Sequence, residues 1–296
     1  MKDFARVLVS FFVILCSFLF SPSAFSQDGS PNGTCSFQTL HLPGNSAGFD
    51  SVEAINDIGA IVGNIADANE ELSHGFLLFN GKFTPFKFPG SVVTAAHDIN
   101  NRAQIVGEYR DRFDHLHGFV VHSGGFQTID VPGKSDTVIE GINDFGDMVG
   151  FFVDETNLGF ITSFVRHNGK FTKFTFPGAD PGTTGAMSIN NSGVIVGTYE
   201  IKFSHHGFMV KNGHFSSIDF PGAAETQVFK ISSDGDIVGT YTLPFGVSNG
   251  FSFANGKFRT INQPNTSFNS VRGVNSHDQI VGLNQMPYKA SCQNVF

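Results

Sequence analysis

The sequence is short of basic residues. Lysine and arginine together number 18 among 296 residues, against 26 aspartates and glutamates, which gives a formal net charge of −8. Proteins that bind nucleic acid need cationic surface to displace the counterions around phosphate groups. The charge balance therefore argues against a nucleic-acid partner.

Recognised catalytic motifs are also missing. The chain contains no glycine-rich phosphate loop, no His-Glu-x-x-His zinc pair and no Gly-x-Ser-x-Gly nucleophile elbow. The segment Asp234–Asp236 resembles part of a calcium loop, but it lacks the roughly six to eight oxygen ligands that calcium prefers. It is interpreted as a turn, so the motifs imply no cofactor.

Helical periodicity and tryptophan are absent, whereas phenylalanine (35) and glycine (34) are abundant. Many turns combined with many bulky apolar side chains favour β-structure over helices. We therefore expect an all-β protein.

The first 26 residues are predicted to be a signal peptide. Lys2 and Arg6 precede the apolar stretch Val7–Phe20, and small residues then allow cleavage before Gln27. The alternative is a membrane anchor, but an apolar stretch of 14 residues is short for spanning a bilayer. We expect a secreted protein, extracellular or periplasmic, with no membrane span in the mature chain.

Cleavage at that point would leave two cysteines, Cys35 and Cys292, near opposite ends of the mature chain. Two such cysteines in an oxidising compartment are expected to form a disulfide.

The remaining chain is a sixfold repeat with spacings of 42 to 47 residues. Copies start near residues 51, 95, 138, 185, 227 and 270. The segment Ile55–Gly63 opens the first full copy, followed by His74-Gly75-Phe76, an Asn80-Gly81 pair and a Pro89-Gly90 step. Each copy is predicted to form four short strands, here lettered A to D, joined by turns that use this Asn and Gly chemistry.

The ends of the chain determine the number of blades. Residues 37–44 match strand D of the other copies, and the copy beginning near residue 270 lacks that strand. After a linker at residues 27–34, residues 35–296 are therefore predicted to form one six-bladed β-propeller of four-stranded antiparallel blades, the last closed by the N-terminal strand. In this register Cys292 takes the place of Asn80, and Cys35 that of Gly81.

These repeated segments together resemble the bacterial extracellular HAF-repeat proteins, a family named for a His-Ala-Phe tripeptide. Here the middle residue is Gly75, Gly118 or Gly207, and two copies depart further, with Thr162-Ser163-Phe164 and Asn249-Gly250-Phe251. The resemblance implies a secreted bacterial repeat protein and supplies no catalytic residues.

Residues shared by the repeats are expected to be structural. We predict that His74, His117 and His206 bond to the backbone of a neighbouring blade. Each asparagine after strand A is expected to close the A–B turn with its side chain, and Ser232 takes this position in the fifth copy.

Function is expected where the repeats differ. The position two residues before the repeated isoleucine or valine varies as Glu53, His97, Glu140, Met187, Phe229 and Arg272. At the mouth of a central channel, Glu53, His97 and Glu140 could hold a divalent metal, and His97, Glu140 and Arg272 are candidate catalytic residues, with Arg272 clamping an anionic group. Alternatively, these side chains pair with one another and solvate the rim of the channel.

Two functions remain open at this point. The first is a monomeric, non-catalytic secreted propeller that binds a protein or glycan partner through the face carrying its variable loops. The second is a metal-assisted hydrolase or lyase at the channel mouth. A propeller can carry either function.

Overall fold

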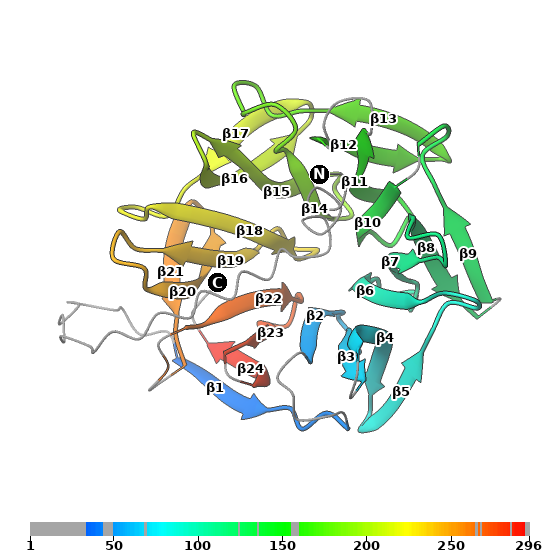
Figure 1. Ribbon diagram of the computed structural model, residues 1–296. Helices are drawn as coiled ribbons and strands as arrows, with labels where there is room; N and C mark the ends of the chain where they lie inside the picture. Colours follow the sequence, from blue (N-terminus) through cyan, green and yellow to red (C-terminus); the bar gives the residue numbers. More distant parts are fainter. Residues whose placement is uncertain are drawn as a thin grey trace.

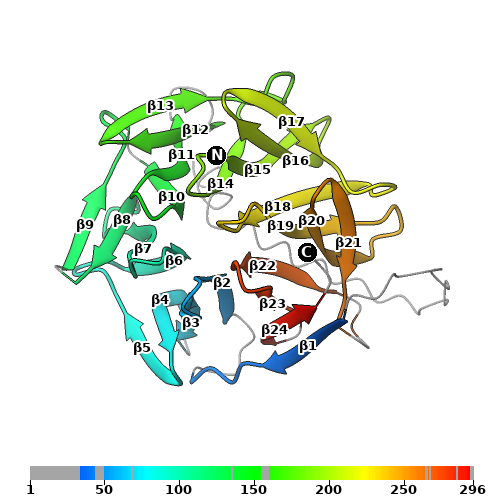
Figure 2. The same cartoon turned by 180° about the vertical axis from the view of Figure 1, so that it is seen from behind.

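The computed structural model describes residues 34–43, 50–67, 70–123, 125–134, 136–154, 160–263, 266, 268–284 and 286–293. Their 24 strands form six four-stranded antiparallel sheets arranged in a ring, which is the predicted six-bladed propeller (Figures 1 and 2). The predicted signal peptide lies outside the described residues. Within them, no helix is long and apolar enough to cross a membrane.

The first three blades follow one another without interruption. Blade 1 contains β2 (Ser51–Ile55), β3 (Ile61–Asp67), β4 (Glu70–Phe79) and β5 (Lys82–Phe86). Blade 2 contains β6 (Val93–Ile99), β7 (Ile105–Arg110), β8 (Leu116–His122) and β9 (Gly125–Ile129). Blade 3 contains β10 (Asp136–Ile142), β11 (Met148–Asp154), β12 (Phe160–His167) and β13 (Lys170–Phe174).

The other three blades complete the circle. Blade 4 contains β14 (Gly185–Ile189), β15 (Ile195–Ile201), β16 (Ser204–Lys211) and β17 (His214–Ile218). Blade 5 contains β18 (Glu225–Ile231), β19 (Ile237–Thr242), β20 (Ser248–Ala254) and β21 (Lys257–Ile261). Blade 6 contains β22 (Ser270–Val274), β23 (Gln279–Leu283), β24 (Pro287–Gln293) and, from the other end of the chain, β1 (Thr34–Thr39).

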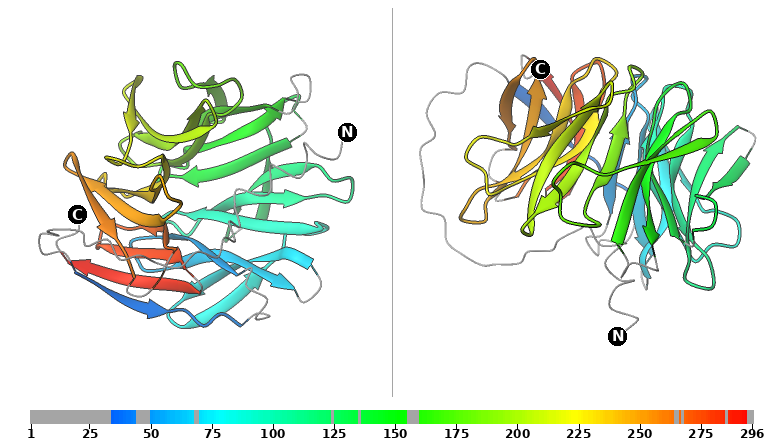
Figure 3. Two further views of the ribbon diagram at one scale, coloured as in Figure 1. Left: turned by 60° about the vertical axis from the view of Figure 1, so that its left-hand side comes forward. Right: turned by 90° about the horizontal axis from the view of Figure 1, so that it is seen from above.

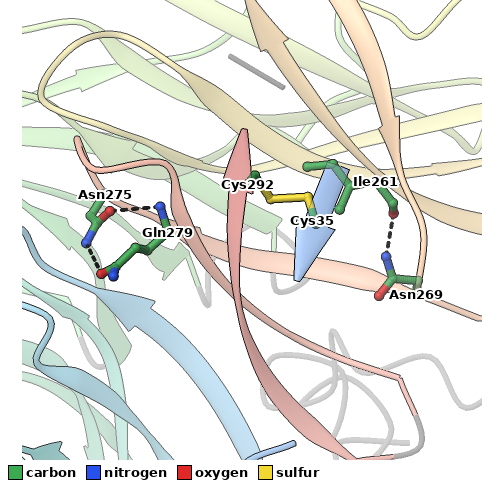
Figure 4. Close-up of a disulfide and its surroundings, with 6 residues drawn as sticks. All are labelled: Cys35, Ile261, Asn269, Asn275, Gln279 and Cys292. Atoms are coloured by element: carbon green, nitrogen blue, oxygen red, sulfur yellow. Dashed lines mark hydrogen bonds between the residues drawn. A yellow bond between two sulfur atoms is a disulfide. The ribbon is translucent and has the colours of Figure 1, made fainter. Parts of the chain in front are cut away.

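The closure of blade 6 follows the predicted register. Tyr288 pairs with Gly282 as Phe76 pairs with Gly63, and Cys35 lies directly opposite Cys292 in the β1–β24 ladder. The two cysteines form a disulfide with a Cα–Cα distance of 4.1 Å, at the position where the other blades have a C–D hairpin turn (Figure 4). The predicted disulfide is therefore confirmed.

The ring has two faces, seen edge-on in Figure 3. The turn face carries the short A–B and C–D turns. On it, Asn56 Oδ1 accepts a hydrogen bond from the Ala60 N–H, as expected for an Asx-type turn. Asn80 and Gly81 turn between β4 and β5 with φ of 50° and 74°, a backbone region that asparagine and glycine tolerate. The loop face carries the B–C loops and the D–A connections.

The core lies between neighbouring blades, because each blade buries both faces against the next. Leu77 of blade 1 packs into a cluster with Ala54 and Val62 of its own blade and Ala96 and Ile99 of blade 2. Equivalent clusters fill the other seams, so no blade is buried on its own.

Candidate functional site

All six variable residues of strand A occupy β-bulges. In every blade the A–B register shifts across this one position, for example between Val52 and Ala54 around Glu53. The same shift surrounds His97, Glu140, Met187, Phe229 and Arg272. A bulge inserts one extra residue and redirects its side chain, and such bulges are common beside functional sites. The variable position is thus a repeated structural feature of the channel wall.

The glycine of each Ile-Val-Gly segment makes this bulge possible. Gly63 pairs with Val52, next to the bulge, and a Cβ added to it would lie 2.0 Å from the backbone oxygen of Ser51. Equivalent glycines in the other blades would bring a Cβ within about the same distance of strand A, for example 1.9 Å from Ala95 O at Gly107. Only glycine fits there, which explains its presence in all six copies.

His97 joins two carboxylates from neighbouring blades. Its Nε2 lies 3.1 Å from Glu108 Oε2 on β7, and its Nδ1 lies 3.7 Å from Glu140 Oε2 on β10. The three side chains are only 11 to 20% exposed. Glu53 lies near enough to act electrostatically on both His97 and Glu140. Of the three residues that the sequence suggested as metal ligands, the structure therefore brings His97 and Glu140 into contact, whereas Glu53 acts on them only through its charge.

Electrostatics keep this imidazole protonated. Burial alone would lower the pKa of His97, but the opposing attraction of Glu140 and Glu108 prevails and raises it from 6.5 to about 9. Burial is also the largest influence on Glu140, whose pKa it raises, while His97 acts in the opposite direction. With this raised pKa, His97 is a cation between carboxylates at neutral pH.

Arg272 does not join these carboxylates. Its guanidinium lies 4.3 Å from the ring centroid of Phe229, the bulge residue of the preceding blade. The six bulge residues thus fall into an ionisable group in blades 1 to 3 and a group of Met187, Phe229 and Arg272 in blades 4 to 6. Within the described residues, no group of three or more His, Cys, Asp or Glu side chains is arranged to hold a metal ion.

An ion pair that the sequence reasoning missed crosses the channel. Asp98 and Lys230 each follow a bulge residue, on the inner strands β6 and β18 of opposite blades (Figure 1). Lys230 Nζ lies 3.2 Å from Asp98 Oδ1 and donates to the backbone oxygen of Glu140 at 3.1 Å. Asp98 Oδ2 accepts from the Ile142 N–H. This pair plugs the channel and neutralises both charges.

A ring of hydrogen bonds narrows the channel at the turn face. Five of the six seams are bridged by an asparagine side chain that donates to the backbone oxygen of the next blade: Asn56 to Asn100, Asn100 to Asn143, Asn143 to Asn190, Asn190 to Ser232, and Asn275 to Asn56. Ser233 Oγ also donates to Asp57 Oδ2, reaching past blade 6. Residues of this rim, together with Asp98 and Lys230, line a pocket of about 60 Å³.

For two of the three repeated histidines, His117 and His206, the predicted backbone partner was wrong. His117 Nδ1 lies 2.8 Å from Asp130 Oδ2, and His206 Nδ1 lies 3.0 Å from Asp219 Oδ1. Both aspartates belong to the C-terminal end of the same blade, not to the backbone of a neighbour. The His117 ring also stacks on Tyr109, which stacks on Phe88 from the preceding connection with a centroid distance of 3.7 Å. These stacks contribute to the packing of the seams.

Exposed apolar side chains gather on the loop face. Nine large hydrophobic side chains are exposed among the described residues, and seven of them belong to B–C loops or D–A connections. These seven are Val92, Phe113, Phe203, Phe245, Val247, Phe268 and Met286, here called the apolar crown. Only Ile58 and Phe145 lie on the turn face. Apolar exposure concentrated on one face is a sign of an interaction surface.

Phe203 is the most informative member of the crown. It is 89% exposed and forms a two-residue turn with Lys202, with φ of 66° and 52°. Positive φ at both positions suits Asn-Gly, the pair that this blade uses at Asn212-Gly213. A phenylalanine held in this region and left in solvent is strained without any gain from packing, a situation typical of functional positions.

Comparison with solved structures supports the architecture. A virginiamycin B lyase from Staphylococcus aureus matches 88% of this chain and 99% of its own, with a TM-score of 0.53 and 12% identity. An Aleuria aurantia lectin, solved with Fucα1-6GlcNAc, covers 83% and 95% at the same TM-score and identity. TolB from Acinetobacter baumannii gives 0.54 and 12%, with 81% of this chain spanning 62% of that protein. At such identity these similarities show the propeller fold alone.

No family model and no curated protein matches the chain. The resemblance to HAF-repeat proteins therefore stays a prediction from the repeated segments.

Proposed function

We propose that this protein is a secreted, non-catalytic propeller that binds a protein partner through its loop face. The observation that carries this proposal is the apolar crown, and above all the strained, 89% exposed Phe203 and the 95% exposed Phe245. The disulfide is consistent with an oxidising compartment outside the cytosol.

A protein is favoured over a glycan because the crown is broad. Its members extend over blades 2, 4, 5 and 6 and over the connections between blades. Aromatic residues, methionine and arginine are enriched at protein interfaces, and Arg112 already lies over the Phe113 ring at 4.8 Å. Several apolar side chains that lie far apart suit a large, fairly flat protein surface better than they suit a single sugar.

The metal-assisted hydrolase or lyase has less support. Both ring nitrogens of His97 already contact carboxylates, Nε2 that of Glu108 and Nδ1 that of Glu140. The channel charges are also paired internally, notably through Asp98 and Lys230. The direct test is the metal content of purified protein and of the E53A/E140A variant. Stoichiometric metal that disappears in this variant would revive the enzyme hypothesis.

The main experiment compares the two faces. We would incubate immobilised wild type, the loop-face variant F203S/F245S and the turn-face variant I58S/F145S with the envelope and secreted fractions of the source organism. Each variant removes two exposed apolar side chains, so both should retain the fold. We expect a stoichiometric protein partner to bind the wild type and the turn-face variant, but not the loop-face variant.

Two further measurements decide the class of partner. A photoreactive phenylalanine analogue at position 203 should crosslink to that partner, and the same analogue at position 145 should not. A glycan array probed with the wild type should give no signal that depends on Phe203 and Phe245. A face-dependent glycan signal without a protein adduct would replace the protein with a glycan, and equal binding by both variants would overturn the proposal.

A further inference from the structure

A second feature lies on the opposite face, where the two ends of the chain meet. The seam between blades 6 and 1 contains a cavity of about 520 Å³, here called the seam cavity. This volume lies within the range of roughly 300–1,000 Å³ typical of small-molecule sites. Four of its lining residues are aliphatic, namely Leu40, Ile58, Ile61 and Leu78, and they are here called the aliphatic wall.

The cavity is also lined by a lysine, at a position where the other blades have a small or apolar residue. Lys289 pairs with Val281, the valine of the Ile-Val-Gly segment in blade 6. The residues in this place in blades 1 to 5 are Leu77, Val120, Val165, Met209 and Ser252. Leu77 and Met209 pack against the next blade, and Lys289 correspondingly reaches toward Gly59 of blade 1. Blade 6 therefore has a charged residue at a position where the other five blades have an uncharged one.

This ammonium group has no counter-ion in the described part of the chain. The half-buried side chain of Lys289 forms no ion pair and no hydrogen bond with the described residues. Asp57 also lines the cavity, but its carboxylate accepts hydrogen bonds from Ser276 N, Asn101 Nδ2 and Ser233 Oγ. Burial raises the pKa of Asp57, but these hydrogen bonds prevail and lower it, so Asp57 is already fully engaged at the rim.

A neighbouring amide adds a directed donor. Gln279, which also lines the cavity, accepts from Asn275 Nδ2 through its Oε1 at 3.1 Å (Figure 4). This contact fixes the orientation of the carboxamide and leaves its NH₂ group without a partner among the described residues. The seam cavity thus combines an unpaired cation, a free amide donor and an aliphatic wall.

We infer that the seam cavity binds a small amphipathic carboxylate, with the carboxylate at Lys289 and Gln279 and the apolar body against Leu40, Ile58 and Leu78. A carboxylate would supply the counter-ion and hydrogen-bond acceptor that Lys289 lacks. Displacing water from the aliphatic wall would add affinity in proportion to the apolar area buried. The site is independent of the loop face.

The experiment uses octanoate, octanol and octylamine, three probes with the same chain and different head groups. Calorimetric titration of each into the full mature protein should show that octanoate binds most tightly. The K289M variant restores the type of residue found at Met209, so it should fold. We expect it to weaken octanoate binding about tenfold, as for the loss of one charge-assisted hydrogen bond, and to leave octanol binding unchanged or stronger.

The matched control is K82M, which removes an exposed lysine from the β4–β5 hairpin of blade 1 and should change nothing. The inference would be overturned if octylamine bound as tightly as octanoate. It would also be overturned if the K289M variant bound octanoate as tightly as the wild type. Absence of any octanoate binding to the wild type would do the same. Methyl resonances of Ile58 and Leu78 that shift on octanoate addition would locate the ligand in the seam cavity.

Discussion

The ring is expected to depend on the bond between Cys35 and Cys292. Replacing both residues with alanine removes a crosslink between positions 257 residues apart in the sequence. In the chain-entropy model, a loop of this length stabilises the folded state by about 5 kcal/mol. Unfolding entropy of about 2.1 cal/mol/K per residue gives roughly 0.55 kcal/mol/K for the propeller, so the expected loss in melting temperature is about 10 °C.

The loss should begin at one strand. β1 is the outer strand of blade 6 and pairs only with β24. Without the disulfide it is held by that ladder, by the Leu40 N–H bond to Pro287 O, and by contacts such as the edge-on packing of Phe37 against Tyr288. We therefore expect the amides of β1 and β24 to lose hydrogen-exchange protection before those of any other blade.

The assay is scanning calorimetry of the wild type with and without reductant, beside the C35A/C292A variant. Reductant should lower the wild-type melting temperature to about that of the variant and should leave the variant unchanged. Hydrogen exchange on both forms then locates the opening. A variant that melts within about 2 °C of the wild type, or protection lost evenly over six blades, would refute this account of ring closure.

Two further predictions concern the channel. The pKa of His97 is raised from 6.5 to about 9, so its protonation should add about 3 kcal/mol to the free energy of unfolding below pH 6.5, and this stability should be lost as the pH rises through 9. In melting curves recorded between pH 6 and 10, the H97Q variant should not show this loss of stability. An identical loss in the variant would contradict the assignment. The K230M variant should lower the free energy of unfolding, measured in urea, by about 3–5 kcal/mol, because it leaves Asp98 buried without its cation. The double variant D98N/K230M should recover at least half of that loss. Equal losses in the two variants would show that Asp98 and Lys230 are not coupled.

The closure of the ring was predictable because β-pairing is periodic. The segment at Phe37 has the spacing of the other D strands, so its register against the chain's last strand, and with it the disulfide, followed from simple counting. Turn chemistry was equally local, since Asn-Gly pairs mark the C–D hairpins in the sequence. Interactions between residues close in sequence, or repeated at a constant spacing, leave a visible pattern.

The channel was predictable only in part. The variable position identified the bulge residues and the proximity of His97 and Glu140, because that position is defined by the repeat. Asp98 and Lys230 were missed, since they are 132 residues apart and only the assembled ring places them opposite each other. Likewise, the partner of His117 was missed because Asp130 follows strand D, and the local pattern does not show that its side chain turns back.

Differences between repeats fall into two kinds, and the distinction guides the search for function. In the channel, unusual charges compensate one another: His97 lies between carboxylates, and Lys230 reaches across to Asp98. Such differences need no outside partner. Phe203 is strained and exposed, and the half-buried Lys289 has no counter-ion among the described residues, so neither departure from the repeat is compensated there. Because uncompensated strain costs free energy of folding, it is expected to persist only where binding uses it, and a charge without a counter-ion can attract a ligand of opposite charge. By this argument we propose the loop face and the seam cavity, rather than the central channel, as the places where this propeller binds other molecules.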